Sequence, residues 1–158
     1  MMDVRNAEAS EISLLAQLWY DGWQDAHADI LPVELKRMRT LESFSERLDG
    51  LLPNVRVIGE IGEPLGLCIP KDDELYQLYV AAEARGQGAA AALIIDAEAR
   101  LAENGAQTAW LACAIGNERA ARFYEKAGWH RAGTIVSQLE TPDGVFPLEV
   151  WRYEKALT

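Results

Sequence analysis

The segment Arg85-Gly-Gln-Gly-Ala-Ala places two glycines, Gly86 and Gly88, between an expected strand and an expected helix. Glycine lets the backbone turn tightly and leaves no Cβ between the chain and a ligand. The first turn of a helix carries unbonded N–H groups and the positive end of the helix dipole, which suit phosphate oxygens. Arg85 adds a positive charge for the same group. These residue types suit a phosphate-binding turn, and a plain strand-to-helix turn explains the same glycines equally well.

Two phosphate-binding patterns fit this segment. The first, Gly86-x-Gly88-x-x-Ala91, matches the dinucleotide-binding fingerprint with alanine in its third position. That fingerprint needs an acidic residue about 20 residues further on, at the end of the next strand, to hold a ribose. The next expected strand ends in Ala112-Cys113-Ala114, so the acid is missing. The dinucleotide interpretation is therefore the weaker of the two.

The second frame, Arg85-x-x-Gly88-x-Ala90, resembles the acyl-CoA-binding motif of the GNAT superfamily of N-acetyltransferases, Gln/Arg-x-x-Gly-x-Gly/Ala. The strand before it, Glu-Leu-Tyr-Gln-Leu-Tyr-Val at 74–80, is similar to that family as well. So is segment 117–129, Asn-Glu-Arg-Ala-Ala-Arg-Phe-Tyr-Glu-Lys-Ala-Gly-Trp, in which Trp129 stands where phenylalanine is usual. The order of elements fits this family over nearly the whole chain.

The resemblance implies acetyl-CoA as the cosubstrate and no metal. The pyrophosphate would rest on backbone amides of the glycine loop, and the pantetheine arm would pair with the backbone of a splayed strand. The side chains of Leu78 and Val80 are expected in the core, so only their backbones are implicated. Asn117 would bond the pantetheine region, cap a helix, or do both. The implied cofactor-binding residues are Leu78, Tyr79, Val80, Arg85, Gly86, Gln87, Gly88, Ala89, Ala90 and Asn117.

Two residues match the family's proton-transfer positions. Tyr124 matches a tyrosine that acts as the acid: a phenol of pKa about 10 is protonated at neutral pH and can donate to a thiolate of pKa about 8.5. Glu74 opens the strand beside the cofactor, matches a commonly acidic position, and could take the amine proton through water. The alternatives are an ordinary half-buried helix tyrosine and a solvated strand-end charge.

The acceptor implied by the resemblance is a primary amine of a small molecule or peptide. Trp23 and His27 lie at helical spacing and could form part of an aromatic wall, since cations favour tryptophan faces. Tyr76 could line the same cleft. Core packing is the competing expectation for the tryptophan. Asp25 is expected on a solvated helix face, and Cys113 is expected in the core rather than as a nucleophile.

Hydrophobic periodicity predicts the elements that position these residues. A helix follows Ser10, which can cap it; a second covers Val33–Arg39; and Thr40 can cap a third. Three strands, a helix ending at Glu103, a strand, a helix capped by Asn117 and a final hairpin follow. The expected strand segments are Val55–Ile58, Pro64–Ile69, Glu74–Val80, Thr108–Cys113, Trp129–Glu140 and Phe146–Tyr153. The fold class is mixed α/β, with a mostly antiparallel central sheet flanked by helices, in the GNAT-like acyl-CoA N-acyltransferase arrangement.

Length and composition narrow the classes further. With 158 residues, the chain fits one domain, 1–158. The 25 acidic and 15 basic residues give a net charge of −10, which argues against nucleic-acid binding. Two cysteines provide no disulfide framework, and no apolar run approaches membrane-spanning length, so a cytoplasmic protein without a membrane partner is expected. A late strand can pair across a homodimer in this family. The rival from another class is a non-catalytic acyl-CoA-binding or regulatory module.

Overall fold

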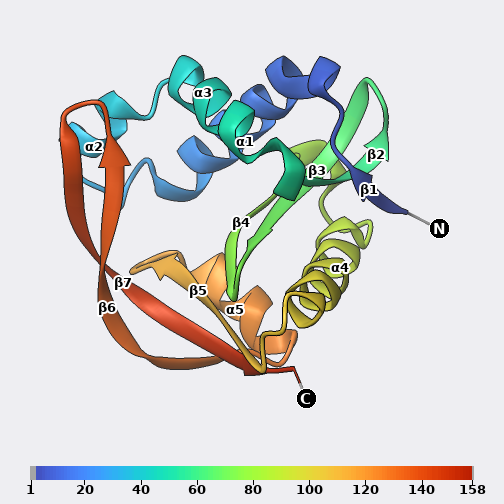
Figure 1. Ribbon diagram of the computed structural model, residues 1–158. Coiled ribbons are helices and arrows are strands. Elements are labelled where there is room, and N and C mark those ends of the chain that lie inside the picture. The colour runs from blue at the N-terminus through green and yellow to red at the C-terminus, as the bar shows by residue number, and fades with distance from the viewer. Residues whose placement is uncertain (1–2, 158) are drawn as a thin grey trace.

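The computed structural model describes residues 3–157 and contains one seven-stranded sheet with helices on both faces (Figure 1). The strand order is β1-β2-β3-β4-β5-β7-β6, and every neighbouring pair is antiparallel except β4 with β5. The strands are β1 (Val4–Asn6), β2 (Arg56–Glu60), β3 (Glu63–Lys71), β4 (Glu74–Val80), β5 (Thr108–Ala114), β6 (His130–Thr141) and β7 (Gly144–Ala156). The expected mixed, mostly antiparallel sheet is therefore confirmed.

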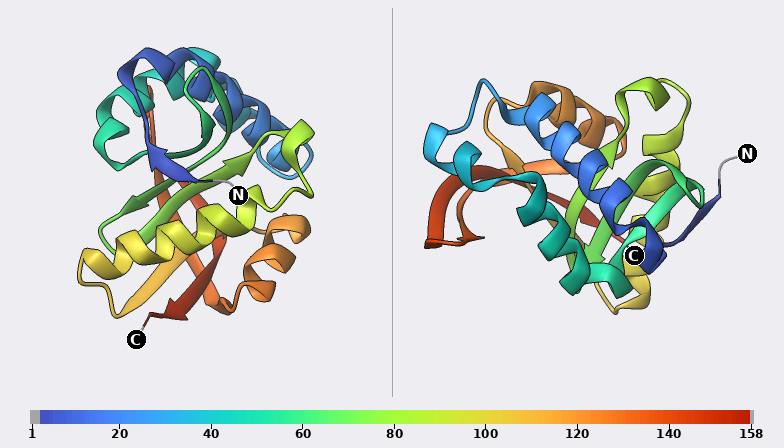
Figure 2. Two further views of the ribbon diagram at one scale, coloured as in Figure 1. Left: turned by 90° about the vertical axis from the view of Figure 1, so that its right-hand side faces the viewer. Right: turned by 90° about the horizontal axis from the view of Figure 1, so that it is seen from above.

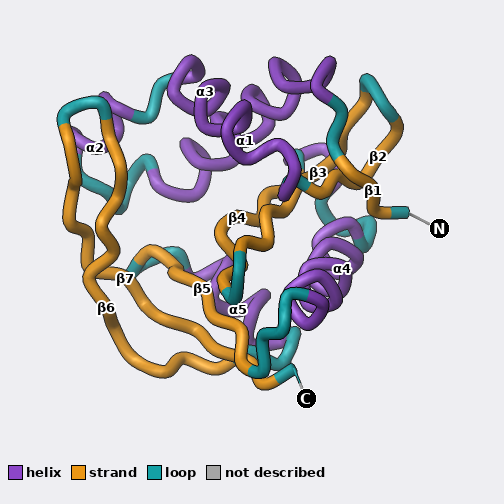
Figure 3. Tube along the Cα trace, viewed as in Figure 1, coloured by secondary structure: helices purple, strands orange, loops and turns teal. Residues whose placement is uncertain are grey.

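Two helical layers sandwich this sheet, and Figure 3 separates them from the strands by colour. The helices are α1 (Ile12–His27), α2 (Val33–Met38), α3 (Leu41–Leu51), α4 (Ala89–Glu103) and α5 (Glu118–Lys126). One core lies between the sheet and α4 with α5, and contains Leu93 and Tyr124. A second core lies on the opposite face under α1, α2 and α3, and contains Trp19 and Phe44. Burial of these apolar side chains is the main driving force for the sandwich.

Local sequence signals explain most of the helix boundaries. Thr40 accepts a hydrogen bond from the Ser43 backbone at 3.1 Å, which confirms the predicted cap of α3. The first helix differs from expectation, because a short 3-10 turn, Ala9–Glu11, precedes α1. A reciprocal capping box between Glu8 and Glu11 begins that turn, so Ser10 does not cap the helix.

The sequence interpretation missed β1, which is only three residues long. Strand β1 adds to the free edge of β2 with Val4 opposite Ile58. Three residues are too few for a period-two pattern to be recognised, so the assignment depends on the tertiary partner.

The β6–β7 hairpin is long and reaches over the sheet to the helical layer formed by α1, α2 and α3 (Figures 1 and 2). Leu139, Phe146 and Leu148 near its tip pack against the core of that layer. Arg39, at the end of α2, donates from Nη1 to the Glu140 carbonyl at 3.0 Å. The hairpin tip is thus anchored to α2 across 101 positions of sequence.

No helix within residues 3–157 combines the length and apolar character needed to cross a membrane. The same part of the chain contains no group of three or more His, Cys, Asp or Glu side chains arranged to hold a metal ion.

Candidate active site between the separated strands

The two parallel strands at the centre of the sheet touch at one end only. Their single register pair joins Glu74 to Trp110, and the Trp110 backbone also donates to the Asp73 carbonyl at 3.1 Å. Beyond this point β4 and β5 separate. The edge of β4 that faces β5 therefore carries backbone N–H and C=O groups that the sheet does not use, from Leu78 to Val80.

A β-bulge in β4 sets which side chains face the opening. Ile69 of β3 pairs with Gln77, but Pro70 pairs with Leu75, so Tyr76 is an extra residue in β4. The bulge shifts the strand's alternation, so Leu75 and Leu78 face the α4 core while Tyr76 and Tyr79 face the opposite core. Two aromatic hydroxyl side chains thus come to the same side of the strand.

A pocket of about 340 Å³ fills the space between the separated strands, a volume within the range of small-molecule sites. Helix α1 contributes Gly22 and His27 to its wall. Gly22 permits close packing, because a Cβ there would lie 2.7 Å from Cδ1 of Tyr79. The pocket wall includes nine of the residues selected from the sequence, namely His27, Tyr76, Leu78, Tyr79, Val80, Arg85, Ala90, Asn117 and Tyr124. Glu74, Trp23, Gly86, Gln87, Gly88 and Ala89 are not part of this wall.

The glycine loop leads from β4 into α4 at one end of the pocket. Gly86 and Gly88 have φ angles of +80° and +87°, a left-handed conformation that glycine adopts without strain. Gly88 is the N-cap of α4, and no side chain caps this helix. The backbone N–H groups of the first turn therefore remain available to an anion, and a Cβ at either glycine would meet nothing within 4 Å.

Arg85 and Arg119, which both line the pocket, share an ion pair with Asp25 of α1. Nη2 of Arg85 bonds to Oδ2 of Asp25 at 2.6 Å, and Arg119 of α5 bonds to the same oxygen at 3.0 Å. These two guanidinium groups, Arg85 first, hold the pKa of Asp25 below its usual value. Asp25 is exposed, as expected of a solvated helix face, and the two ion pairs are an additional feature that the sequence did not predict. Three residues from distant segments meet here, so no local pattern signals these ion pairs.

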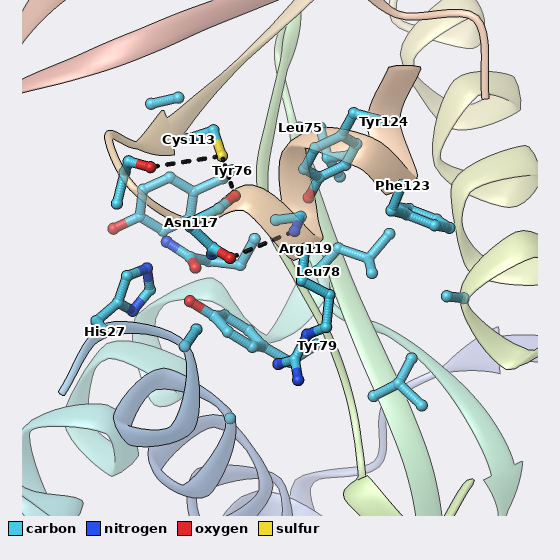
Figure 4. A pocket seen from close by; sticks show the side chains of 18 of the residues that line it. His27, Leu75, Tyr76, Leu78, Tyr79, Cys113, Asn117, Arg119, Phe123 and Tyr124 are labelled. Carbon is cyan, nitrogen blue, oxygen red and sulfur yellow. Dashed lines mark hydrogen bonds between the residues drawn. The ribbon is translucent and has the colours of Figure 1, made fainter. Parts of the chain in front are cut away.

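Tyr124 projects from α5 with its hydroxyl directed into the pocket (Figure 4). Its side chain is buried in the core beside Phe123 and Trp129, and no hydrogen bond from a described residue contributes to its pKa. Burial raises the pKa of Tyr124 above the ordinary phenol value, so the hydroxyl keeps its proton at any working pH. The group is a permanent donor aimed at whatever fills the pocket.

Asn117 and Cys113 lie next to this tyrosine. Asn117 Oδ1 accepts from the Ala120 backbone at 3.3 Å, which confirms the cap of α5, and the residue also lines the pocket. Burial raises the pKa of the Cys113 thiol to about 12, so almost none of it is thiolate at neutral pH. Cys113 is 4% exposed and belongs to the core as expected.

The acceptor residues selected from the sequence divide between wall and core. Trp23 packs its ring against His27 and Phe44 in the core, with centroids 5.0 and 6.2 Å away. His27 lines the pocket, and its Nδ1 lies 2.9 Å from the Trp23 carbonyl. Because a carbonyl only accepts, Nδ1 carries the hydrogen and Nε2 keeps a free lone pair. His27, Tyr76 and Tyr79 gather at the end of the pocket away from Phe123 (Figure 4).

Glu74 sits at the narrow end of the opening, where β4 and β5 are still paired. Burial raises the pKa of its carboxyl to about 7, and nearby Lys71 opposes part of that shift. A carboxylate with a pKa near the working pH suits a general base, because it accepts a proton at neutral pH and releases it again.

The substitution Glu74→Gln separates a base role from a merely buried charge. If Glu74 is the base, the single-turnover transfer rate of the parent rises through about pH 7, and the variant lacks this rise. Burial alone has a different signature. A raised pKa means that the folded state holds a proton already lost by the unfolded state, so stability falls between about pH 4.5 and 7. Glu74→Gln should remove that loss, and its melting temperature relative to the parent should increase across the same window.

Glu63→Gln is the matched control, an exposed glutamate at the start of the neighbouring strand β3. It should change neither the pH–rate curve nor the melting difference. A Glu74→Gln variant whose rate still rises through pH 7 removes Glu74 from the proton path, whatever the melting curves show.

Comparisons with known proteins place this geometry in one family. The sequence model of the acetyltransferase (GNAT) family matches residues 14–129. An uncharacterized N-acetyltransferase of Mycobacterium tuberculosis is 44% identical over 69 residues, which is 44% of this chain and 44% of that protein. The chain thus matches less than half the length of this curated relative.

Solved structures agree on the fold. A GCN5-related N-acetyltransferase from Rhodopseudomonas palustris superposes with a TM-score of 0.75 at 19% identity, covering 98% of this chain and 94% of that one. A putative acetyltransferase from Salmonella typhimurium, solved with its cofactor acetyl-CoA, gives 0.67 at 15% identity and covers 100% and 95%.

Proposed function

Because the chain belongs to the acetyltransferase (GNAT) family, we propose that it transfers an acetyl group from acetyl-CoA directly to a primary amine of a small molecule or peptide. The observation that carries this proposal is the single pocket that joins three parts: the edge of β4 left open by β5, the end of the glycine loop, and the Tyr124 hydroxyl. Acyl-CoA carries a pyrophosphate, a pantetheine arm with amide groups and a thioester sulfur. The glycine loop, the open edge of β4 and the Tyr124 hydroxyl would bind or protonate these groups in turn.

The cofactor would bind in two sections. The pyrophosphate would accept hydrogen bonds from backbone N–H groups of the glycine loop and of the first turn of α4, between Gly86 and Ala90. The pantetheine arm carries amide groups, which would pair with the open edge of β4 at Leu78 to Val80 as an added strand. A solved structure from Salmonella typhimurium with acetyl-CoA shares this fold and supports the choice of cofactor.

The chemistry would proceed by direct attack. A protonated amine first loses one proton through water to Glu74, and the neutral amine then forms a C–N bond to the thioester carbonyl carbon. The tetrahedral intermediate collapses, the C–S bond breaks, and the sulfur takes a proton from the Tyr124 hydroxyl. The surplus proton of the attacking nitrogen returns through water to the Tyr124 oxygen. The products are an N-acetylated amine and free CoA thiol. Tyr124, as a neutral donor beside the pocket, and Glu74, with its pKa raised to about 7, have the protonation states that these steps require.

The direct test is thiol release from acetyl-CoA in the presence of a panel of primary amines. We expect release with at least one amine, and we expect CoA to raise the melting temperature while NAD does not. At 100 times the dissociation constant, preferential binding adds about 2.7 kcal/mol, or about 5–10 °C for a domain of this size. A CoA-dependent rise without release from any amine would indicate a binding module instead. A rise with NAD and none with CoA would contradict the cofactor assignment.

A further inference from the structure

Two cationic side chains contact Tyr76, which belongs to the pocket wall, and a third lies nearby; Arg39, Arg47 and Lys71 are not themselves part of that wall. Arg47 of α3 donates from Nη2 to the Tyr76 hydroxyl at 2.7 Å, and its guanidinium lies 4.4 Å above the Trp19 ring. Lys71 places Nζ 5.6 Å from the Tyr76 ring centroid. Arg39, from the end of α2, is close enough to Arg47 and Tyr76 for their charges to act on its pKa. Tyr76 itself lines the pocket.

Among the described residues, none of these three cations has a carboxylate partner within 4.0 Å. Within residues 3–157, eight of the 15 basic side chains have such a partner, and these three are among the seven that do not. The other arginines near the pocket, Arg85 and Arg119, share Asp25 instead. Lys36, Arg37, Arg122 and Lys126 also lack a carboxylate partner in the described part of the chain, and Arg39 differs from all of these unpaired cations because it is buried.

Arg39 is buried, so the lack of a carboxylate partner costs free energy at this residue. Its side chain is 4% exposed and makes one side-chain hydrogen bond, to the Glu140 carbonyl, out of five possible N–H donors. Burial first, and then the charge of Arg47, lower the pKa of Arg39 to about 10. Its other guanidinium nitrogens are not sealed off, because the fully enclosed unpaired side-chain atoms in residues 3–157 are Trp19 Nε1 and Arg100 Nε. An anion that reached these nitrogens would relieve both the desolvation and the repulsion.

We propose that the Arg39–Arg47–Tyr76 cluster binds a carboxylate group carried by the acceptor, so that the substrate is an amine that also bears a carboxylate. The inference rests on the proposed acetyl transfer to an amine. The planar guanidinium fork matches the two oxygens of a carboxylate, and the Tyr76 hydroxyl, which accepts from Arg47, is left with its own hydrogen to donate. The amine end would then point along the pocket toward Tyr124, on the far side of the opening.

The experiment compares matched acceptors: ω-amino acids of increasing length, each against its own primary amide. We expect the parent to favour the carboxylate member of the best pair by about 10- to 100-fold in kcat/KM, the range of charge-assisted hydrogen bonds to a buried arginine. In Arg47→Gln the ratio of kcat/KM for the carboxylate acceptor to that for its amide should fall toward 1. The fall should come from a lower kcat/KM for the carboxylate acceptor. Arg47→Lys, which keeps the charge and loses the fork, should restore only part of the preference.

Arg37→Gln is the matched control, because it removes the same charge from an exposed position of α2 two residues from Arg39. It should leave the preference unchanged. Equal use of acids and amides by the parent, or a preference that survives Arg47→Gln, would overturn the carboxylate site while leaving acetyl transfer intact. If no amine of either class releases thiol, calorimetric binding of the same acids and amides to the CoA-bound protein decides. Tighter binding of acids that Arg47→Gln abolishes supports the site, and equal binding overturns it.

Discussion

Tyr124→Phe is expected to lower the single-turnover rate of acetyl transfer by about 100- to 10,000-fold while leaving acetyl-CoA affinity nearly unchanged. The substitution keeps the ring and its packing against Trp129 and Tyr153, so the fold of α5 should survive. The lost hydroxyl is the permanent donor on the pocket wall. Its loss affects the step in which sulfur leaves, which is a property of the transition state rather than of the bound ground state.

The raised pKa of Tyr124 does not rule out this donation. Burial acts on sulfur in the same way: the thiol of Cys113, in the same pocket wall, has its pKa raised to about 12. A CoA thiolate formed there is desolvated by the same surroundings, so its own affinity for a proton increases as well. The pKa of the Tyr124 hydroxyl and the pKa of the CoA thiol therefore rise together, and the proton transfer keeps much of its driving force.

A thioester with a more acidic leaving thiol should partly rescue Tyr124→Phe, because its sulfur needs the proton less. Tyr153→Phe is the control: it removes another buried tyrosine hydroxyl, one bonded to Glu125 at 2.6 Å and outside the pocket wall. It should lower stability and leave the rate alone. A Tyr124→Phe variant that transfers at the full parental rate would assign this tyrosine to packing.

Gly88→Ala is expected to weaken CoA binding by about 10- to 100-fold, the cost of one strong charge-assisted hydrogen bond. A Cβ at this position meets no protein atom within 4 Å, so it projects into open space beside the backbone N–H groups that are proposed to hold the pyrophosphate. The φ of +87° also disfavours alanine and tilts the loop away from the geometry that aligns the N–H groups.

Gly105→Ala separates these two effects. Gly105 lies just past the other end of α4, with a φ of +92° and equally open surroundings. Both variants should lose similar stability by thermal melting, since both force alanine into a left-handed conformation. CoA affinity, measured by calorimetry, should fall only for Gly88→Ala. Equal affinities in both folded variants would show that the loop is a turn and nothing more.

Sequence reasoning succeeded where a few neighbouring residues decide the structure. The caps by Thr40 and Asn117, the glycine loop and the final hairpin depend on local backbone chemistry, which the residue types reveal. The glycine loop and Tyr124, which the structure brings to one pocket or its edge, could be selected for the same reason, since each lies in a motif that is continuous in sequence.

The contacts around Tyr76 and Asp25 could not be predicted from the sequence, because tertiary packing assembles them. The bulge at Tyr76 depends on the register with β3, and Arg47 reaches Tyr76 over 29 positions. Arg39 contacts the hairpin over 101 positions, and Asp25 meets Arg85 over 60. No spacing rule connects such residues. Trp23 shows the limit of local patterns. Its helical spacing correctly predicted a place on α1, but it did not distinguish a residue of the pocket wall from a residue of the core.

Because Glu74 and Trp110 form the single register pair between β4 and β5, the sheet consists of two groups of strands that are joined at one end only. Strands β1–β4 pack against α4 on one face and against α1, α2 and α3 on the other. Strands β5–β7, which include the long hairpin, pack against α5. A pantetheine arm laid along the open edge of β4, as proposed, would supply hydrogen bonds that the sheet lacks there. Binding of the cofactor would then also stiffen the sheet between β4 and β5.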